Sequence, residues 1–291
     1  MEAIDVHQHL WPVALIEALR SRPRPPRLVG WRLELDGEAP YDVDPAAHDV
    51  PKRVALETDD GTGLALVALS AALGVEDPDL LAAWHSGALE LPAPFKAWAA
   101  VSVRELDPST LQANLDAGCV GLELPATPLG TPDGLERVGP LLEVCEAANK
   151  PVLVHPGPAT PRDNVPGWWP AVVDYVGQLH AAWWAWHVAG RAQFPKLRLC
   201  FAAAAGLAPV HHERLTARGG TYRRIDPDVF VDTSSYGPRG LDAVIRVLGI
   251  DTVAFGTDRP YAEPTNPELG AAATAAIRRT NPHRLLEGGL P

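Results

Sequence analysis

The sequence contains few cysteines, and their spacing argues against a disulfide framework. Only three occur among the 291 residues, at Cys119, Cys145 and Cys200, and none of them forms a CxxC pair. An odd number of cysteines in or beside apolar segments is typical of proteins from a reducing compartment. We therefore expect three buried, unpaired thiols and a cytoplasmic location.

Long apolar runs and basic runs are also missing. No stretch approaches the roughly 18–20 continuous apolar residues of a membrane span, and the N-terminus enters a strand-like pattern without the features of a signal peptide. The 36 acidic residues outnumber the 25 basic ones, which gives a formal net charge of −11. This balance disfavours nucleic acid and anionic membranes as partners, and we expect a soluble protein with a small-molecule substrate.

Short apolar segments alternate with helical segments along the whole chain. Most of the apolar segments lack polar alternation, as expected for parallel strands buried on both faces, and eight is the number that a (β/α)8 barrel requires. No break in composition marks a second domain, so we predict one α/β barrel domain over residues 1–291. The predicted strands are 3–9, 64–70, 97–103, 120–125, 151–156, 197–204, 229–233 and 252–257.

Two segments are too long for simple connections between a strand and a helix. Residues 10–50 follow the first predicted strand and include a run from Leu33 to Glu38 that suggests a small hairpin. Residues 157–170 follow the fifth strand and contain Trp168 and Trp169. Both segments should lie on the carboxyl-terminal face of the barrel, where long loops commonly form lids or substrate walls.

Residues of the metal-ligand type end three of the predicted strands. His7 and His9 are two positions apart on the first strand, so their side chains point to the same face. His155 ends the fifth strand and Asp258 ends the eighth, which is a neighbour of the first in a closed barrel. Burying such groups unpaired would be costly, so their recurrence predicts a site for one divalent ion. Asp258 could also accept the proton of an attacking water.

With these motifs in view, the sequence resembles the amidohydrolase superfamily, in the amidohydrolase-related branch that includes the aminocarboxymuconate-semialdehyde decarboxylase-like enzymes. The resemblance implies a distorted (β/α)8 TIM barrel with one divalent ion, usually zinc, held by the residues that match His7, His9, His155 and Asp258. The matching segments, in order, are IDVHQH at 4–9, PVLVHPG at 151–157, FPKLRLCFAAAAGLAP at 194–209, VFVDTSSYGP at 229–238, VAFGTDRP at 253–260 and NPHRLL at 281–286.

The sequence departs from the family pattern at one position of the sixth strand. Relatives carry a histidine there, in a setting like FPKLRxxxxHxGGxxP, and this chain has Ala203. The family histidine commonly activates water or holds the substrate, so the departure puts the reaction in doubt more than the metal. His211 and His212 follow in the next predicted helix, where a solvated helix face is the alternative to a catalytic role.

Several further side chains are candidates for roles around the site. Glu123 and Asp232 end the fourth and seventh strands, where they could orient the ligands through hydrogen bonds; Glu123 could instead bridge two ions or make a structural pair. Arg24 and Arg27 belong to an arginine cluster that could bind a substrate carboxylate, with a proline-stiffened solvated loop as the alternative. The Trp168–Trp169 pair matches, by its spacing from His155, an aromatic substrate wall of the decarboxylase-like relatives.

Three functions are compatible with the sequence. The first is a metal-dependent hydrolase in which activated water attacks an amide, ester or lactone, and the HQHxW opening at 7–11 resembles that of sugar-lactone hydrolases in the same superfamily. The second is a non-oxidative decarboxylase of an aromatic or unsaturated acid, whose substrate carries a carboxylate. The third is an altered barrel that binds a ligand without turnover. The tryptophan-rich helix predicted at 171–193 is a candidate homodimer contact.

Overall fold

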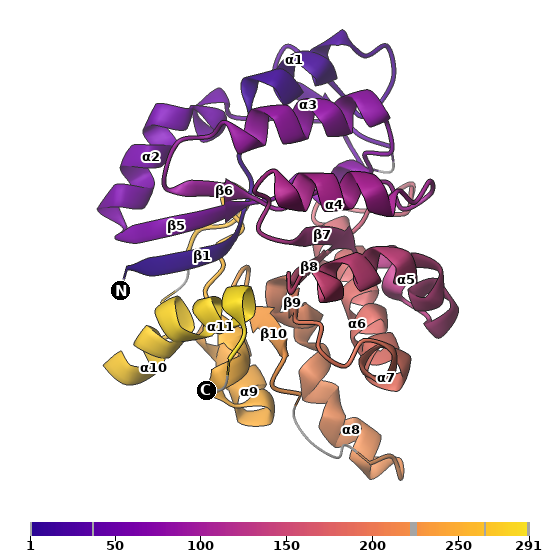
Figure 1. Ribbon diagram of the computed structural model, residues 1–291, viewed down its shortest axis with the longest axis vertical. Helices are drawn as coiled ribbons and strands as arrows, with labels where there is room; N and C mark the ends of the chain where they lie inside the picture. The colour runs from indigo at the N-terminus through magenta and orange to yellow at the C-terminus, as the bar shows by residue number, and fades with distance from the viewer. Residues whose placement is uncertain (1, 37, 222–225, 265, 290–291) are drawn as a thin grey trace.

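Eight parallel strands form the centre of the molecule (Figure 1). The computed structural model describes residues 2–36, 38–221, 226–264 and 266–289. Within these residues most strand positions are buried, as the apolar sequences predict. The strands are β1 (Ala3–Gln8), β5 (Thr62–Val67), β6 (Phe95–Ala97), β7 (Leu122–Pro125), β8 (Val152–His155), β9 (Leu199–Phe201), β10 (Val229–Asp232) and β11 (Val253–Ala254).

The strands follow one another in chain order and close into a barrel. Continuous pairing gives the orders β1-β5-β6 and β11-β10-β9-β8-β7. Parallel bridges between Gln8 and Arg259 and between Ala99 and Leu122 join the ends of the two sheets. The fold is therefore a distorted (β/α)8 barrel, as predicted, with breaks at both seams between the sheets.

Helices surround the strands (Figure 1). Four of them begin in the same way, with an Asp or Thr cap whose side chain accepts backbone N–H bonds and a proline in the first two positions. The α-helices are α1 (Val13–Ser21), α2 (Val50–Asp59), α3 (Pro78–Leu89), α4 (Pro108–Asp116), α5 (Pro132–Ala147), α6 (Tyr175–Ala185), α7 (Arg191–Gln193), α8 (His212–Ala217), α9 (Pro238–Leu248), α10 (Ala271–Ala275) and α11 (Asn281–Glu287).

Short helical turns extend or link these helices. Three of them, η4, η5 and η8, have the wider π-helical winding and are continuous with their neighbouring α-helices, so residues 170–193 form one helical stretch. The turns are η1 (Pro45–His48), η2 (Ala71–Leu73), η3 (Thr127–Leu129), η4 (Pro170–Asp174), η5 (Trp186–Gly190), η6 (Ala203–His211), η7 (Ile250–Thr252) and η8 (Ala276–Thr280).

The core has two parts, one inside the barrel and one between the barrel and its helices. Trp98 fills the barrel interior, where its indole Nε1 donates a 3.0 Å hydrogen bond to the carbonyl of Val6. Phe230 and Cys200 pack in the same interior cluster. All three cysteines are buried and free, as expected from their spacing.

The segment after β1 is more ordered than its sequence predicts. It forms helix α1 and a three-stranded antiparallel sheet of β2 (Arg27–Val29), β3 (Arg32–Glu34) and β4 (Tyr41–Asp42). The predicted hairpin from Leu33 to Glu38 thus covers the last two residues of β3, which pairs with both β2 and β4, but it ends before β4 begins. The predicted strand 97–103 begins too late and ends too late, because Phe95–Ala97 pairs with β5 and only a single bridge, at Ala99, follows.

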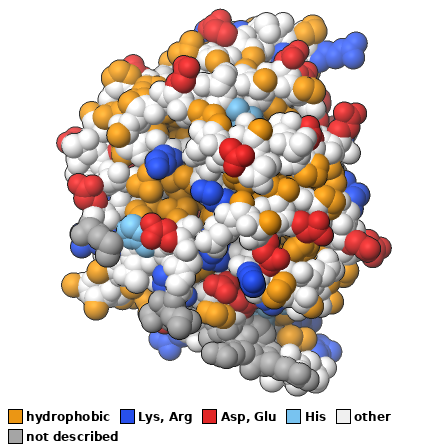
Figure 2. Space-filling model, viewed as in Figure 1, with side chains coloured by type: hydrophobic (Ala, Val, Ile, Leu, Met, Phe, Trp, Pro, Cys, Tyr) orange, Lys and Arg blue, Asp and Glu red, His pale blue; other side chains and the backbone are white. Residues whose placement is uncertain are grey.

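The visible surface carries acidic and basic side chains interspersed among apolar ones (Figure 2). No helix within the described residues is long and apolar enough to cross a lipid bilayer.

Candidate metal centre

Four side chains from three strand ends meet at the mouth of the barrel. One nitrogen or oxygen atom from each of His7, His9, His155 and Asp258 lies within 4.8 Å of the others. Nε2 of His9 lies 3.1 Å from Nε2 of His7 and 3.1 Å from Oδ1 of Asp258. The three imidazole centroids are each 5.0 Å apart, with their planes nearly perpendicular. The predicted convergence of these residues is therefore present.

Each imidazole is oriented by an oxygen atom on its far side. Nδ1 of His7 lies 2.7 Å from Oδ2 of Asp232, Nδ1 of His9 lies 3.0 Å from the carbonyl of Ala68, and Nδ1 of His155 lies 2.9 Å from the carbonyl of Pro156. An oxygen acceptor places the proton of a neutral imidazole on Nδ1. In that tautomer Nε2 carries the lone pair that a bound ion would accept, and Nε2 of each ring faces the shared centre; Nδ1 of His9 also lies 3.2 Å from the N–H of Ser70.

The electrostatics of the cluster fit a bound cation. Oδ1 of Asp258 is buried, and no hydrogen-bond donor within the described residues satisfies it. Burial opposes charge on His7, but the carboxylates of Asp232, Asp258 and Asp5 together outweigh this effect and raise the His7 pKa to about 9. Burial and the neighbouring histidines hold the His155 pKa well below its ordinary value. Three imidazoles and a carboxylate that compete for protons at one point form a donor set suited to a divalent ion.

The backbone of β1 holds the turn that carries Asp258. The backbone N–H of Asp258 donates a 2.8 Å bond to the carbonyl of His7, and the N–H of His9 donates to the carbonyl of Arg259. Asp258 adopts a positive φ of 62°, which aspartate tolerates better than most residues. The first and last strands are thus joined beside the cluster.

Glu123 links the cluster to the loop that follows β5. Its carboxylate accepts hydrogen bonds from the backbone N–H groups of Leu69, at 3.0 Å, and Ala71, at 2.9 Å. One of its oxygens lies 3.9 Å from Nδ1 of His155. Both carboxylate oxygens are occupied by the loop, so the geometry favours an orienting role for Glu123 over a bridge between two ions.

A buried polar network that the sequence reasoning missed supports the backbone of β1. Arg53 on α2 donates to the carbonyl of His9 at 2.9 Å and to the side chain of Gln8. Gln8 donates to Asp5 and to Glu57, and Glu57 also pairs with Arg259 at 3.2 Å. The polar residues Asp5 and Gln8 within the apolar first strand were the visible indication of this network.

The chain winds in the left-handed sense where relatives carry the missing histidine. Residues from Ala203 to Leu207 have φ values between 47° and 61°, although only Gly206 lacks a side chain. The N–H of Ala203 donates a 2.8 Å bond to Oδ1 of Asp232, whose other oxygen holds His7. Two successive hydrogen bonds, through Asp232, therefore connect the backbone of Ala203 to His7. The side chain of Ala203 is only a methyl group.

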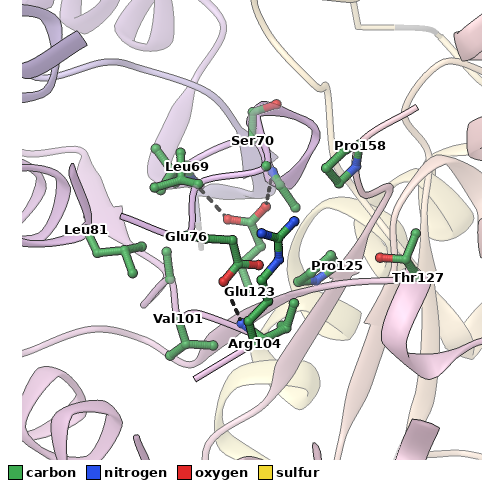
Figure 3. Close-up of a pocket in the computed structure, with 15 residues that line it drawn as sticks. Leu69, Ser70, Glu76, Leu81, Val101, Arg104, Glu123, Pro125, Thr127 and Pro158 are labelled. Atoms are coloured by element: carbon green, nitrogen blue, oxygen red, sulfur yellow. Dashed lines mark hydrogen bonds between the residues drawn. The ribbon is translucent and has the colours of Figure 1, made fainter. Parts of the chain in front are cut away.

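A pocket of about 190 Å³ lies next to the cluster, above the ends of β5 to β8 (Figure 3). Glu123 and Ser70 line it, and the N–H of Ser70 lies 3.2 Å from Nδ1 of His9. Apolar side chains form most of its wall, and Arg104 points into it from the loop after β6 (Figure 3). An engineered cavity of comparable size admits a benzene-sized molecule, so the pocket can take a small organic group.

The four residues predicted to bind substrate are not part of this cluster or pocket. Arg27 pairs with Glu34 at 2.6 Å within the antiparallel sheet, and Arg24 is exposed. Trp168 and Trp169 stack on each other with centroids 5.9 Å apart, and Trp168 is exposed. Their role in binding remains a prediction.

Three of the seven histidines outside the cluster, His48, His85 and His212, are buried. His48 stacks on Trp11, and His85 accepts a hydrogen bond from the N–H of Ala100; ordinary surface positions would be expected for both from the sequence, and that expectation is wrong. His212 is buried beside Trp183, whereas His211 is exposed and lies against His180. His180 and Trp183 belong to α6, and His211 and His212 lie where η6 meets α8. These side chains therefore pack where α6 meets the segment after β9.

The family model described as amidohydrolase matches residues 4–287. Among solved structures, the chain is similar to an apo IDCase from Metarhizium anisopliae, with 20% identity, a TM-score of 0.73 and coverage of 98% of this chain and 97% of that one. It is also similar to 5-carboxyvanillate decarboxylase from Sphingomonas paucimobilis, with 16% identity, a TM-score of 0.69 and 98% of each chain covered. For 2,6-dihydroxybenzoate decarboxylase from Rhizobium the values are 18% identity, a TM-score of 0.64 and 99% of each chain. No curated protein matches the sequence.

Proposed function

This chain belongs to the amidohydrolase family, and we propose that it is a metal-dependent decarboxylase of a small organic acid. The observation that carries the proposal is the set of three imidazoles, each held at Nδ1, that direct Nε2 toward the carboxylate of Asp258. The decarboxylase names of two similar structures that the chain matches over nearly its full length favour this reaction over hydrolysis.

His7, His9, His155 and Asp258 would hold one divalent ion. Bound there, the ion would supply positive charge that attracts a substrate carboxylate and stabilises negative charge as it develops. The donor set suits both zinc and manganese, and a structure of 5-carboxyvanillate decarboxylase from Novosphingobium aromaticivorans is described as a complex with manganese.

Asp258 is the residue that we assign to proton transfer. Decarboxylation breaks the bond between the carboxyl carbon and the neighbouring carbon, and the electron pair stays on the neighbouring carbon. That carbon must receive one proton as carbon dioxide leaves. Asp258 combines a buried, unsatisfied Oδ1 with a side chain that is 19% exposed, so it can pass a proton from solvent to the substrate.

The apolar pocket beside Glu123 would hold the body of the substrate. Its 190 Å³ fits a single ring or a short unsaturated chain, and Leu69 and Val101 lie in its wall. Apolar walls exclude water, which strengthens the electrostatic contacts of the reacting group.

Hydrolysis of an amide, ester or lactone is the second candidate. It is favoured by the same partly exposed carboxylate of Asp258, which could equally accept a proton from water. The methyl side chain of Ala203 offers no second base beside the cluster, which weakens this candidate.

A product assay in labelled water separates these reactions. The purified protein, loaded with manganese or with zinc, would be incubated with aromatic and unsaturated acids and with lactones in H₂¹⁸O. Carbon dioxide release without ¹⁸O in the organic product supports decarboxylation, and ¹⁸O in the product with no carbon dioxide would establish hydrolysis. If neither product forms with any substrate, the chain is an altered ligand-binding barrel and the proposal fails.

A further inference from the structure

A second, larger cavity lies beside the metal centre, and Tyr261 stands between the two. The cavity has a volume of about 420 Å³ and opens between η1, the start of α2 and the loop after β11. None of the four cluster residues, all of which the structure describes, lines this cavity. Tyr261 does line it, and the ring of Tyr261 lies 5.2 Å from that of His9. The aromatic ring therefore separates the cavity from an imidazole of the cluster.

The turn that carries Tyr261 is anchored on two sides. The carbonyl of Asp258 accepts hydrogen bonds from the N–H of Tyr261 at 2.8 Å and from the N–H of Ala262 at 3.2 Å. The side chain of Arg259 is buried and pairs with Glu57 on α2 at 3.2 Å. These contacts tie the turn both to the metal centre and to the neighbouring helix, so Tyr261 forms a fixed wall.

The hydroxyl group of Tyr261 is held as well. It donates a hydrogen bond to the hydroxyl oxygen of Tyr41, which lies on β4 of the antiparallel sheet. Tyr41 lines the same cavity, and Tyr41 and Tyr261 are 36% and 43% exposed. A molecule in the cavity can therefore reach both side chains, while the Tyr261 hydroxyl has the partner that a partly enclosed tyrosine requires.

The cavity behind Tyr261 offers space that the pocket beside Glu123 lacks. That pocket has about 190 Å³, compared with about 420 Å³ for the cavity. The cavity also has apolar wall, to which Val43, Ala47 and Leu56 contribute. Room for a larger organic group thus exists next to the metal centre, and the ring of Tyr261 closes it off.

We propose that Tyr261 is a specificity-determining residue, which limits the size of the acid that can bind at the metal centre. This assignment rests on the proposed function, in which the centre holds the carboxylate of an organic acid. With Tyr261 in place, the body of the acid is confined to the pocket beside Glu123. Without the ring, the centre and the larger cavity become one space, into which a second fused ring can extend. Overlap with a fixed side chain is costly, because it forces strained rotamers or backbone shifts.

The binding of two acids of different size tests this limit without turnover. The probes are benzoate and 2-naphthoate, titrated by calorimetry into the manganese-loaded protein. We expect the wild type to bind benzoate more tightly by about tenfold or more, the discrimination that an apolar pocket makes against one surplus group. Tyr261→Ala should remove this preference or reverse it through a gain in 2-naphthoate affinity. Tyr261→Phe keeps the ring and should keep the wild-type preference.

A matched variant separates the position of the ring from the volume of the cavity. Leu56 lies on α2, lines the same cavity and is 39% exposed. Leu56→Ala enlarges the cavity but leaves the ring of Tyr261 in place, so it should bind the two acids as the wild type does. If Tyr261→Ala does not fold by circular dichroism, Tyr261→Leu keeps an apolar side chain without the ring and should show a smaller shift in the same direction.

Three results would overturn the assignment. They are equal binding of the two acids by the wild type, no gain in 2-naphthoate affinity in the folded Tyr261 variants that lack the ring, and a gain of the same size in Leu56→Ala. The proposed function is tested separately, by carbon dioxide release. A shifted size preference without carbon dioxide release from any acid leaves the size limit standing and removes the proposed function. Carbon dioxide release with an unshifted preference does the reverse.

Discussion

Oδ2 of Asp232 lies 2.7 Å from Nδ1 of His7, and both side chains are almost fully buried. The carboxylate fixes the orientation of the ring, and an acceptor at Nδ1 requires that Nε2 be free to donate its lone pair. Oδ1 of the same carboxylate binds Ser234 and the N–H of Ala203, so Asp232 itself cannot turn away.

We therefore expect Asp232→Asn to weaken metal binding by about 10- to 100-fold. An amide nitrogen facing Nδ1 would donate a proton and force the opposite imidazole tautomer, in which Nε2 is protonated. Metal content after dialysis against buffered zinc or manganese measures the effect, with Asp242→Asn on the exposed face of α9 as the control. Full metal occupancy in Asp232→Asn at limiting metal would contradict the assignment.

Metal removal should destabilise the protein. A ligand at about 100 times its Kd adds roughly 2.7 kcal/mol to the free energy of unfolding when it binds only the folded state. A chelator should thus lower the Tm of the wild type. It should leave the Tm of His7→Ala unchanged, whereas His283→Ala, altered at a half-buried histidine far from the cluster in sequence, should respond like the wild type. A wild-type Tm that is unchanged by the chelator and by added metal would argue against the site.

Asp258→Asn should reduce turnover by about 10²- to 10⁴-fold, the range of a lost proton-transfer group. The amide oxygen can still face the cluster, so partial metal binding is expected, and rates must be expressed per bound metal. Steady-state turnover, divided by the metal content of the same sample, gives the rate per bound metal. Wild-type turnover in a fully loaded Asp258→Asn protein would remove this residue from the mechanism.

Ala205→Gly should stabilise the protein by about 1 kcal/mol, because Ala205 has a φ of 53° and left-handed geometry costs an L-residue roughly 1–2 kcal/mol. The expected rise in Tm is about 2–4 °C for a chain of this size. Ala82→Gly, at an exposed position within α3, should instead destabilise by roughly 0.5–1 kcal/mol. Thermal melts of the two variants should therefore move in opposite directions.

His48 should make the protein less stable in acid. Burial lowers its pKa from 6.5 to about 3, so between these pH values the unfolded chain binds a proton that the folded chain does not. The free energy of unfolding then falls as the pH drops through this window, by ~1.4 kcal/mol per pH unit. Urea unfolding at pH 7 and pH 5 should show that His48→Gln loses roughly 2 kcal/mol less than the wild type between these two conditions. Parallel losses would show that His48 titrates normally.

The barrel and its four converging side chains could be predicted because their determinants are local. Two histidines at a spacing of two on an apolar strand share a face, and parallel strands bring their ends to one rim, so His7, His9, His155 and Asp258 could be placed without coordinates. The starts of helices that begin with Asp or Thr followed by proline could also be predicted from the sequence, as at Asp107 and Thr131.

What could not be predicted depends on contacts distant in sequence. The alanines from Ala203 to Ala205 have the highest helix propensity available, yet they wind left-handed because β9, Asp232 and α6 fix the ends of the segment. Arg53 looked like an ordinary helix residue, and its contact with the carbonyl of His9 follows only from the packing of α2. The burial of His48 depends on Trp11 and Trp31, which the antiparallel sheet brings together.

The seam between the first and last strands also determines when the metal centre can form during synthesis. His7 and His9 leave the ribosome before Asp258, from which roughly 250 residues separate them. A growing chain holds an incomplete set of ligands until the segment after β11 pairs with the end of β1 through Arg259 and Gln8. Loading of the ion therefore waits until Asp258 has been synthesised, and a truncation before β11 would leave His7 and His9 without the carboxylate.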